Sequence, residues 1–152
     1  MKQQREAGFL ITKIHHLSGR IFTRKLKENK IEELNPAQGR IMFVLWRSNG
    51  ISIQELARET GLGKSTLTSM LDRLEIAGHI TRISSGEDRR KTLIVAHEPD
   101  EASMNKYVRV SQKMNELFYQ GFKPDEIDKF ESYLRRVLAN LSNQSLEKDG
   151  GE

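Results

Sequence analysis

One predicted helix in the middle of the chain carries small hydroxyl side chains and cations on a single face. Within residues 63–74 the apolar side chains recur every three or four positions, which predicts one buried stripe: Leu67, Met70, Leu71 and Leu74. The opposite face is polar and consists of Lys64, Ser65, Thr66, Thr68, Ser69, Asp72 and Arg73. Small side chains let a helix sink into the major groove of DNA, where hydroxyls, lysine and arginine bind bases and phosphates. The pattern therefore predicts DNA contacts by Lys64, Ser65, Thr66, Thr68, Ser69 and Arg73.

The alternative for this segment is an ordinary solvent-exposed helix face. Such faces usually carry Glu, Lys and Gln, because these residues form helices more readily than Ser and Thr do. The hydroxyl-rich face of residues 63–74 therefore favours nucleic-acid binding.

A second group of cations lies in a predicted β-hairpin. Residues 80–84 and 92–96 are β-branched runs typical of strands, and the tip between them reads Ser-Gly-Glu-Asp-Arg-Arg-Lys. The sequence predicts that Arg89 and Arg90 bind DNA and that Arg90 enters the minor groove, where narrow A·T-rich stretches attract a guanidinium. Asp88 is expected to pair with a nearby arginine and fix its direction. For either arginine alone, a solvated hairpin tip is the alternative.

The elements that must position these groups are mostly helices. Apolar periodicity and capping signals predict helices over the following ranges: 8–30, 36–49, 52–60, 63–77, 100–121 and 124–143. Asn35 with Gln38, and Ser52 with Glu55, have capping-box spacing. A three-residue turn that contains glycine joins the third predicted helix to the fourth, which gives the dimensions of a helix-turn-helix. The tail, residues 142–152, is expected to fray.

Composition and charge narrow the class of protein. The 152 residues include 25 Lys and Arg, 21 Asp and Glu and no Cys, which excludes disulfides, thiolate metal sites and thiol-based redox sensing. Residues 1–97 hold 17 basic and 10 acidic side chains, whereas residues 98–152 hold 8 basic and 11 acidic ones. The basic first part suits an anionic partner such as nucleic acid, with a merely solvated surface as the alternative. No apolar run approaches the ~20 residues of a membrane span, and a cytoplasmic location is expected.

The order of these elements and three local motifs resemble the MarR (multiple antibiotic resistance regulator) family. The motifs are Gly61-Leu62-Gly63-Lys64-Ser65-Thr66-Leu67-Thr68, Leu71-Asp72-Arg73-Leu74-Glu75 and Asp88-Arg89-Arg90. The resemblance covers about residues 8–143. It implies a mainly α, winged helix-turn-helix fold with a small β-hairpin wing and with N- and C-terminal dimerisation helices. The chain departs from the family at Gly63, where Ser or Asp is the more usual helix cap.

The resemblance also implies a function and a domain organisation. A single MarR-like chain, residues 1–152, would contain a DNA-binding lobe over 35–98 and dimerisation helices over 8–30 and 100–143. The implied protein is a homodimer that binds a pseudo-palindromic double-stranded DNA operator, commonly as a repressor. In that family the recognition helix enters the major groove and the wing arginine enters the minor groove. Many members bind a small amphipathic or phenolic effector.

Candidate ligand, metal and catalytic groups are fewer. His15, Arg20, Trp46 and Tyr107 are candidates for an effector cleft, which the sequence does not rank, although a single Trp usually packs inside a small domain. The histidines form no H-x-x-H or H-x-x-x-H pair, so no metal site is predicted. Arg58 stands where a phosphate-binding loop before Lys64 needs glycine, which argues against a nucleotide site. The sequence predicts no cofactor and no enzymatic activity.

Two functions from different classes fit these residues. The first is a sequence-specific, DNA-binding transcriptional regulator. The second is a helical dimer that acts through protein contacts and has no specific DNA site. They differ in the cations at Lys64, Arg73, Arg89 and Arg90, because only a DNA-binding protein loses salt-dependent affinity when these are replaced.

Overall fold

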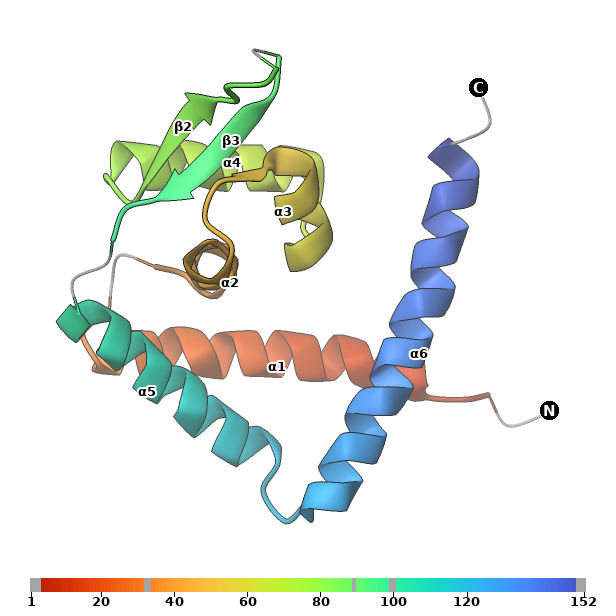
Figure 1. Cartoon of the computed structure of the whole chain (residues 1–152). Coiled ribbons are helices and arrows are strands. Elements are labelled where there is room, and N and C mark those ends of the chain that lie inside the picture. Colours follow the sequence, from red (N-terminus) through yellow and green to blue (C-terminus); the bar gives the residue numbers. More distant parts are fainter. Residues whose placement is uncertain (1–3, 32–33, 89, 99–100, 150–152) are drawn as a thin grey trace. The chain divides into compact units, whose positions relative to one another are not determined.

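A computed structural model describes residues 4–31, 34–88, 90–98 and 101–149 (Figure 1). In chain order the elements are α1 (Ala7–Glu28), α2 (Pro36–Arg47), β1 (Ile51–Ser52), α3 (Ile53–Thr60), α4 (Lys64–Ile76), β2 (Ile80–Ser84), β3 (Thr92–Ala96), α5 (Glu101–Phe118) and α6 (Pro124–Asp149). The chain divides into two compact units, Met1–Gln112 and Lys113–Glu152, and the division falls within α5.

The predicted order of helices and hairpin strands is confirmed, and nearly all their bounds lie within three residues of the predicted ones. The exception is the end of α6, which continues to Asp149 instead of stopping near residue 143. The expectation that the chain frays from Ser142 is therefore wrong for residues 142–149. The physical reason is that no glycine or proline interrupts the sequence between Pro124 and Gly150, so nothing in it stops the helix.

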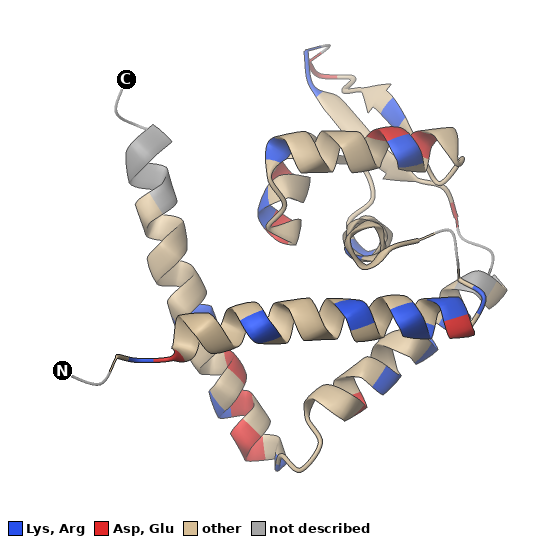
Figure 2. Ribbon diagram, turned by 180° about the vertical axis from the view of Figure 1, so that it is seen from behind, with Lys and Arg blue, Asp and Glu red and all other residues tan. Residues whose placement is uncertain are grey.

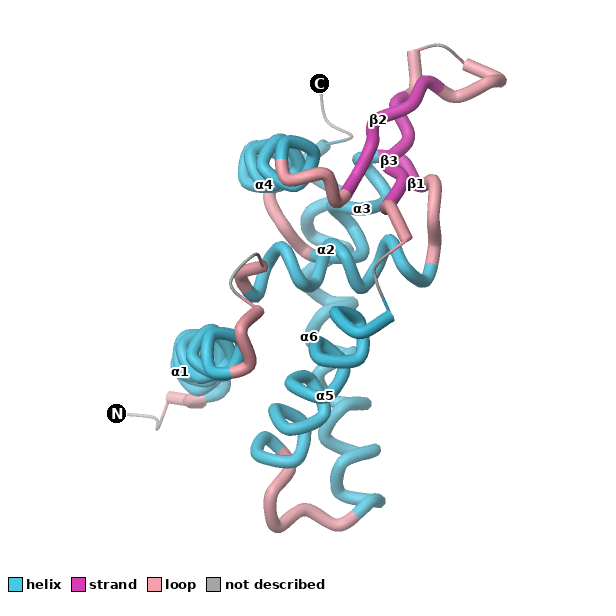
Figure 3. Tube along the Cα trace, turned by 90° about the vertical axis from the view of Figure 1, so that its left-hand side faces the viewer, coloured by secondary structure: helices cyan, strands magenta, loops and turns pink. Residues whose placement is uncertain are grey.

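A three-stranded antiparallel sheet forms the base of the wing. Its strand order is β1-β3-β2, and Figure 3 shows the three strands side by side. β2 and β3 pair from Ile80 opposite Ala96 to Ser84 opposite Thr92, which confirms the predicted hairpin. The third strand was not predicted: Ile51 and Ser52 of β1 pair with Ile94 and Leu93 of β3. A strand of two residues is too short to leave a periodic signal in the sequence.

A continuous apolar core holds α2, α3, α4 and the sheet together. Its most deeply buried members come from every one of these elements: Ile41, Leu45, Leu56, Leu67, Leu71, Leu74, Ile80 and Ile94. Because interiors of this kind are close-packed, the core fixes the orientation of each helix and strand around it. It therefore determines which face of α4 remains exposed.

Local capping signals set where these helices begin and turn. Asn35 accepts a hydrogen bond from the Gln38 amide, and the Gln38 side chain accepts one from the Asn35 amide, so the predicted capping box is complete. At α3, Ser52 accepts from the Glu55 amide at 3.2 Å. Gly61 ends α3 with a φ of 70°, a left-handed conformation that glycine adopts without strain. This turn points α4 away from α3 and completes the helix-turn-helix.

A second, smaller core joins α1, α2 and the first part of α5. Leu26, Tyr107 and Val110 are buried in it, with Phe22 and Trp46 packed against them. The Tyr107 ring meets the rings of Phe22 and Trp46 edge-on, at 5.9 Å between centroids in each case. The aromatic contacts pack these three helices against one another within the first unit.

The second unit has an aromatic cluster at the turn between α5 and α6. Phe118, Tyr119, Phe122 and Phe130 lie with their ring centroids 5.0–6.5 Å apart. Tyr119 donates a hydrogen bond to Glu131 at 2.9 Å, and Arg135 pairs with the same carboxylate at 3.0 Å. These contacts fold the start of α6 back along the end of α5.

The long helices leave many large apolar side chains exposed. On α1 these are Phe9, Leu10, Ile11, Ile14 and Leu17; on α5 they are Met104, Val108, Leu117 and Phe118; on α6 they are Tyr133, Leu134, Val137, Leu138 and Leu141. No helix in the described part of the chain is long and apolar enough to cross a membrane. The exposed residues are thus surface stripes on amphipathic helices.

Candidate nucleic-acid interface

The two faces of α4 differ as the sequence predicts. Leu67, Leu71 and Leu74 are buried in the main core, at most 1% exposed, and Met70 is half-buried. The polar residues predicted to bind DNA are all exposed: Lys64, Ser65, Thr66, Thr68, Ser69 and Arg73. The helix is therefore anchored along one side and presents hydroxyls and cations along the other.

The start of α4 offers main-chain donors. Gly63 occupies the cap position with an extended backbone, and no side chain accepts a hydrogen bond there. The first amides of a helix have no partner within the helix, and the helix dipole makes this end attractive to anions. With Lys64 in the first turn, this end of α4 suits a phosphate.

The Thr68 side chain forms one hydrogen bond within α4. Its hydroxyl donates to the carbonyl oxygen of Lys64 at 2.8 Å. In this conformation the side chain offers its oxygen as an acceptor and its methyl group as an apolar contact. Contact with the methyl of thymine or with a base amino group fits this arrangement.

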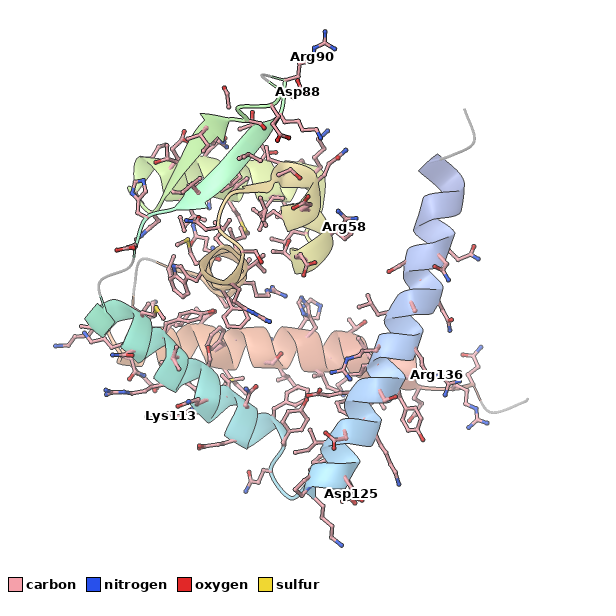
Figure 4. The ribbon with its side chains drawn as sticks, in the orientation of Figure 1. Arg58, Asp88, Arg90, Lys113, Asp125 and Arg136 are labelled. Atoms are coloured by element: carbon pink, nitrogen blue, oxygen red, sulfur yellow. The ribbon has the colours of Figure 1, made fainter. Side chains whose placement is uncertain are left out.

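The wing tip carries Arg90 at its outer end. Figure 4 shows Asp88 and Arg90 at the tip, with the Arg90 side chain projecting away from the sheet. The Asp88 carboxylate accepts a hydrogen bond from the Arg90 main-chain amide at 3.0 Å, and the Lys91 amide donates to the Asp88 carbonyl at 3.0 Å. Asp88 thus contacts the main chain of Arg90 instead of its guanidinium, which differs from the expected pairing with an arginine side chain. Arg89 lies outside the described residues.

Three charged side chains connect the wing to α4, and the sequence did not reveal their contact. Arg82 of β2 donates to Asp72 at 2.6 Å and to Glu75 at 3.1 Å. The hydrogen bond to Asp72 raises the pKa of Arg82, an effect that burial opposes. Asp72 belongs to the polar face of α4, but its carboxylate is engaged by the wing. Sequence spacing could not show this, because the partners come from a helix and a strand.

Charge is distributed unevenly over this surface. Figure 2 shows a basic segment at the start of α4, basic and acidic segments together near the wing tip, and acidic segments on both sides of a basic one toward the end of α4, where Asp72, Arg73 and Glu75 lie. Basic segments also run along α1. The start of α4 and the wing tip both carry exposed cations, Lys64 and Arg90, which attract a polyanion.

Comparison with known proteins agrees with this geometry. The sequence profile of the MarR family matches residues 34–92, which span α2 to the first residue of β3 and include the helix-turn-helix. The chain is 27% identical over 147 residues to the organic hydroperoxide resistance transcriptional regulator of Bacillus subtilis, which covers 95% of both chains. These matches support the resemblance of the chain to MarR-family regulators.

Two further comparisons extend this result. The HTH-type transcriptional regulator TtmR of Methylorubrum extorquens is 33% identical over 86 residues, which are 57% of this chain and only 43% of that regulator. A mutant MarR from E. coli in complex with operator DNA has the same fold, with a TM-score of 0.70 and 21% identity over 86% of this chain and 92% of that one. The predicted resemblance to the MarR family and the winged-helix fold are confirmed.

An open groove of about 480 Å³ lies between α1, the start of α2 and α4. Its lining is His15, His16, Gly19, Arg20, Thr23, Asn35, Pro36, Ala37, Arg40 and Met70. Of the four candidates for an effector cleft, His15 and Arg20 line this groove, whereas Trp46 and Tyr107 pack in the smaller core. Within the described residues, no three His, Cys, Asp or Glu side chains are grouped as a metal site would need.

Proposed function

We propose that this MarR-family protein binds a specific double-stranded DNA operator as a homodimer and acts as a transcriptional repressor in the cytoplasm. The observation that carries the proposal is the division of α4: one side is sealed into the core, and every predicted DNA-contacting residue on the other side is exposed. The proposal includes no enzymatic step.

The residues have separate roles in this proposal. Lys64 and the first amides of α4 bind a phosphate, which sets the depth of the helix in the major groove. The exposed hydroxyl residues Ser65, Thr66, Thr68 and Ser69, together with Arg73, contact base edges and the flanking backbone. Arg90 and Arg89 at the wing tip bind the adjacent minor groove, and Asp88 holds the main chain of Arg90 in a fixed turn.

The proposed homodimer is supported by the apolar stripes of α1, α5 and α6. Leu138 of α6 is 64% exposed and Phe9 of α1 is 67% exposed, although both belong to stripes of large apolar residues. Exposed apolar stripes of this kind mark protein–protein contacts. Two copies related by a two-fold axis would place two α4 helices on successive major grooves of an inverted repeat.

A small amphipathic or phenolic molecule is the proposed effector, and the groove between α1 and α2 is its proposed site. Arg20 and Arg40 supply cationic groups, and Met70 of α4 supplies an apolar contact. Because Met70 belongs to the recognition helix, an occupant of the groove touches the element that reads DNA. A molecule that binds better to one arrangement of the lobe shifts the population toward it and so releases the operator.

Two substitutions test the proposed DNA contacts. Arg90→Ala should weaken operator binding by about tenfold and lower the slope of log affinity against log salt by about one. Arg136→Ala, on the far side of α6 from its apolar stripe, removes the same charge and is the matched control. Unchanged affinity and slope in Arg90→Ala would remove the wing from the interface.

Thr68→Ala should change sequence preference at one position in each half-site and leave the salt slope unchanged. Thr12→Ala is its matched control, because the Thr12 hydroxyl also donates to the carbonyl four residues earlier on an exposed helix face. An identical selected sequence for Thr68→Ala and for the parent protein would contradict the major-groove role of α4.

A further inference from the structure

Arg82 ties the wing to the recognition helix through three hydrogen bonds. Its guanidinium donates to Asp72 at 2.6 Å and to Glu75 at 3.1 Å, and its main-chain amide donates to Glu75 at 3.3 Å. The Arg82 side chain is 24% exposed, less than either carboxylate partner. A guanidinium is a rigid fork of donors, so two carboxylates one turn apart on a helix hold it in one orientation.

Arg82 lies between the buried start of β2 and the exposed end of the strand that leads to the wing tip. Ile80 is the buried residue of β2 and anchors the base of the wing in the main core. Arg82 is half-buried, and the residues that follow it in the strand, Ile83 and Ser84, are both exposed. Along β2, Arg82 is thus the last residue held against the rest of the lobe before the tip.

The hairpin is held on two sides near Arg82: β2 by the Arg82 contact, and β3 by β1, where Ile51 and Ser52 pair with Ile94 and Leu93. β2 and β3 are paired along their whole length, so the two strands move as one ribbon. The tip is closed by the bond from the Ser85 amide to the Lys91 carbonyl and by the Asp88 turn. The direction of the ribbon relative to α4 therefore decides where Arg90 lies relative to Lys64 and Thr68.

We propose that Arg82 is a positioning residue for DNA recognition: its contact with Asp72 and Glu75 sets the angle between wing and α4 at which both grooves are engaged together. The inference rests on the proposed DNA-binding function. Arg82 itself need not touch DNA, because it acts by placing Arg90. Arg82 also neutralises Asp72 and Glu75, which lessens the repulsion between these two carboxylates and the DNA phosphates.

Two variants with opposite changes in charge separate positioning from simple electrostatics. Arg82→Met removes one positive charge, whereas Asp72→Asn combined with Glu75→Gln removes two negative charges. If only charge mattered, the first variant would bind DNA more weakly and the second more tightly. If the contact positions the wing, both variants lose this positioning and should bind the operator about tenfold more weakly. Tighter binding by the Asp72→Asn, Glu75→Gln variant overturns the proposal.

A double-mutant cycle tests whether the effect of Arg82 on DNA affinity passes through Arg90. Arg90→Ala should lower affinity by about tenfold in the parent protein but by less than about threefold in the Arg82→Met background, because a misplaced wing no longer gains from Arg90. Arg82→Lys, which can reach one carboxylate at a time, should recover part of the affinity. An equal effect of Arg90→Ala in both backgrounds overturns the positioning role.

Arg24→Met is the matched control, because it breaks the Arg24–Glu28 pair on α1, away from the wing. Amide exchange in the free protein gives a readout without DNA: in Arg82→Met the β2 and β3 amides should exchange faster while those of α2 stay unchanged. Unchanged exchange in the wing overturns the inference. Failure of the parent protein to bind any selected duplex would instead overturn the proposed function, so the two failures are distinguishable.

Discussion

The lobe formed by α2, α3, α4 and the sheet differs from the long helices α1, α5 and α6 in how far its apolar residues are exposed. In the lobe, α2, α3, α4 and the sheet bury their apolar faces in one shared core, where Ile41, Leu71 and Ile94 are fully buried. In α1, α5 and α6 the stripes are equally regular, but Phe9 and Leu138 remain about two-thirds exposed. The core of the lobe is thus complete within one chain, whereas the apolar stripes of the long helices are the surfaces that the proposed homodimer would cover.

The difference has an energetic meaning. Covering a Leu, Ile or Phe side chain stabilises an assembly by about 1.5–3 kcal/mol, and the long helices offer many such side chains. A second copy that covers these stripes would also fix the distance between two recognition helices. Binding to an inverted repeat would then depend on helices that lie outside the proposed DNA-contacting residues.

The largest expected effect tests the self-contained core of the lobe. Leu71→Ala removes a fully buried side chain between α4 and the sheet, and should lower the free energy of unfolding by about 2–5 kcal/mol. Ile76→Ala on the same helix, where the side chain is 88% exposed, should change it by less than about 0.5 kcal/mol. Urea unfolding at one protein concentration measures both. Equal effects would mean that α4 is not anchored as described.

The next effect tests the long helices. Val137→Asp combined with Leu138→Asp places two charges in the α6 stripe, and should give a folded monomer with operator affinity at least about 100-fold lower. Arg136→Asp changes the net charge equally and lies on the opposite side of the helix. Light scattering and operator titration report the two quantities. A variant that remains dimeric would show that the α6 stripe is not the interface.

A smaller effect is expected where α2 meets α5. A Cβ on Gly39 would clash with the Tyr107 hydroxyl and lie 2.7 Å from the ring atom Cε2, so Gly39→Ala should destabilise the protein by about 1–3 kcal/mol. Gly19→Ala in α1 has open space around the new methyl and should stabilise the helix. Thermal unfolding distinguishes the two. A neutral Gly39→Ala would show that Tyr107 moves aside freely.

The smallest effect is a dependence of stability on alkaline pH. Burial raises the pKa of Tyr107 above its ordinary value of 10.0, although a hydrogen bond with Ser111 and the charge of Arg40 oppose the shift. Because the unfolded chain ionises first, stability is fully present below pH 10 and falls as pH rises through the raised pKa. Urea unfolding between pH 8 and 11 should show a steeper loss for the parent protein than for Tyr107→Phe. Parallel curves would contradict the burial of the neutral phenol.

The sequence predicted most of this fold because its signals are local. The stripe of Leu67, Met70, Leu71 and Leu74 identifies the buried face of α4, and the Asn35 capping box marks the start of α2. Contacts between distant or short segments left no such signal. β1 has only two residues, and the close approach of Gly39 to Tyr107 joins positions far apart in the chain.

The sequence predicted the individual residues of the candidate site but not the contacts between them. Exposure of Lys64, Thr68 and Arg73 followed from helical periodicity alone. The pairing of Asp72 with Arg82 did not, because its partners lie on a helix and a strand that come together only in the folded lobe. The main-chain role of Asp88 likewise depends on the local conformation of the tip.

The central claim, specific binding of an inverted repeat by a dimer, is tested most directly by selecting bound sequences from a randomised duplex pool at two salt concentrations. The account predicts an enriched inverted repeat whose half-sites are centred about 34–36 Å apart, with affinity that falls steeply as salt rises. Absence of any enriched sequence at either salt concentration would contradict it.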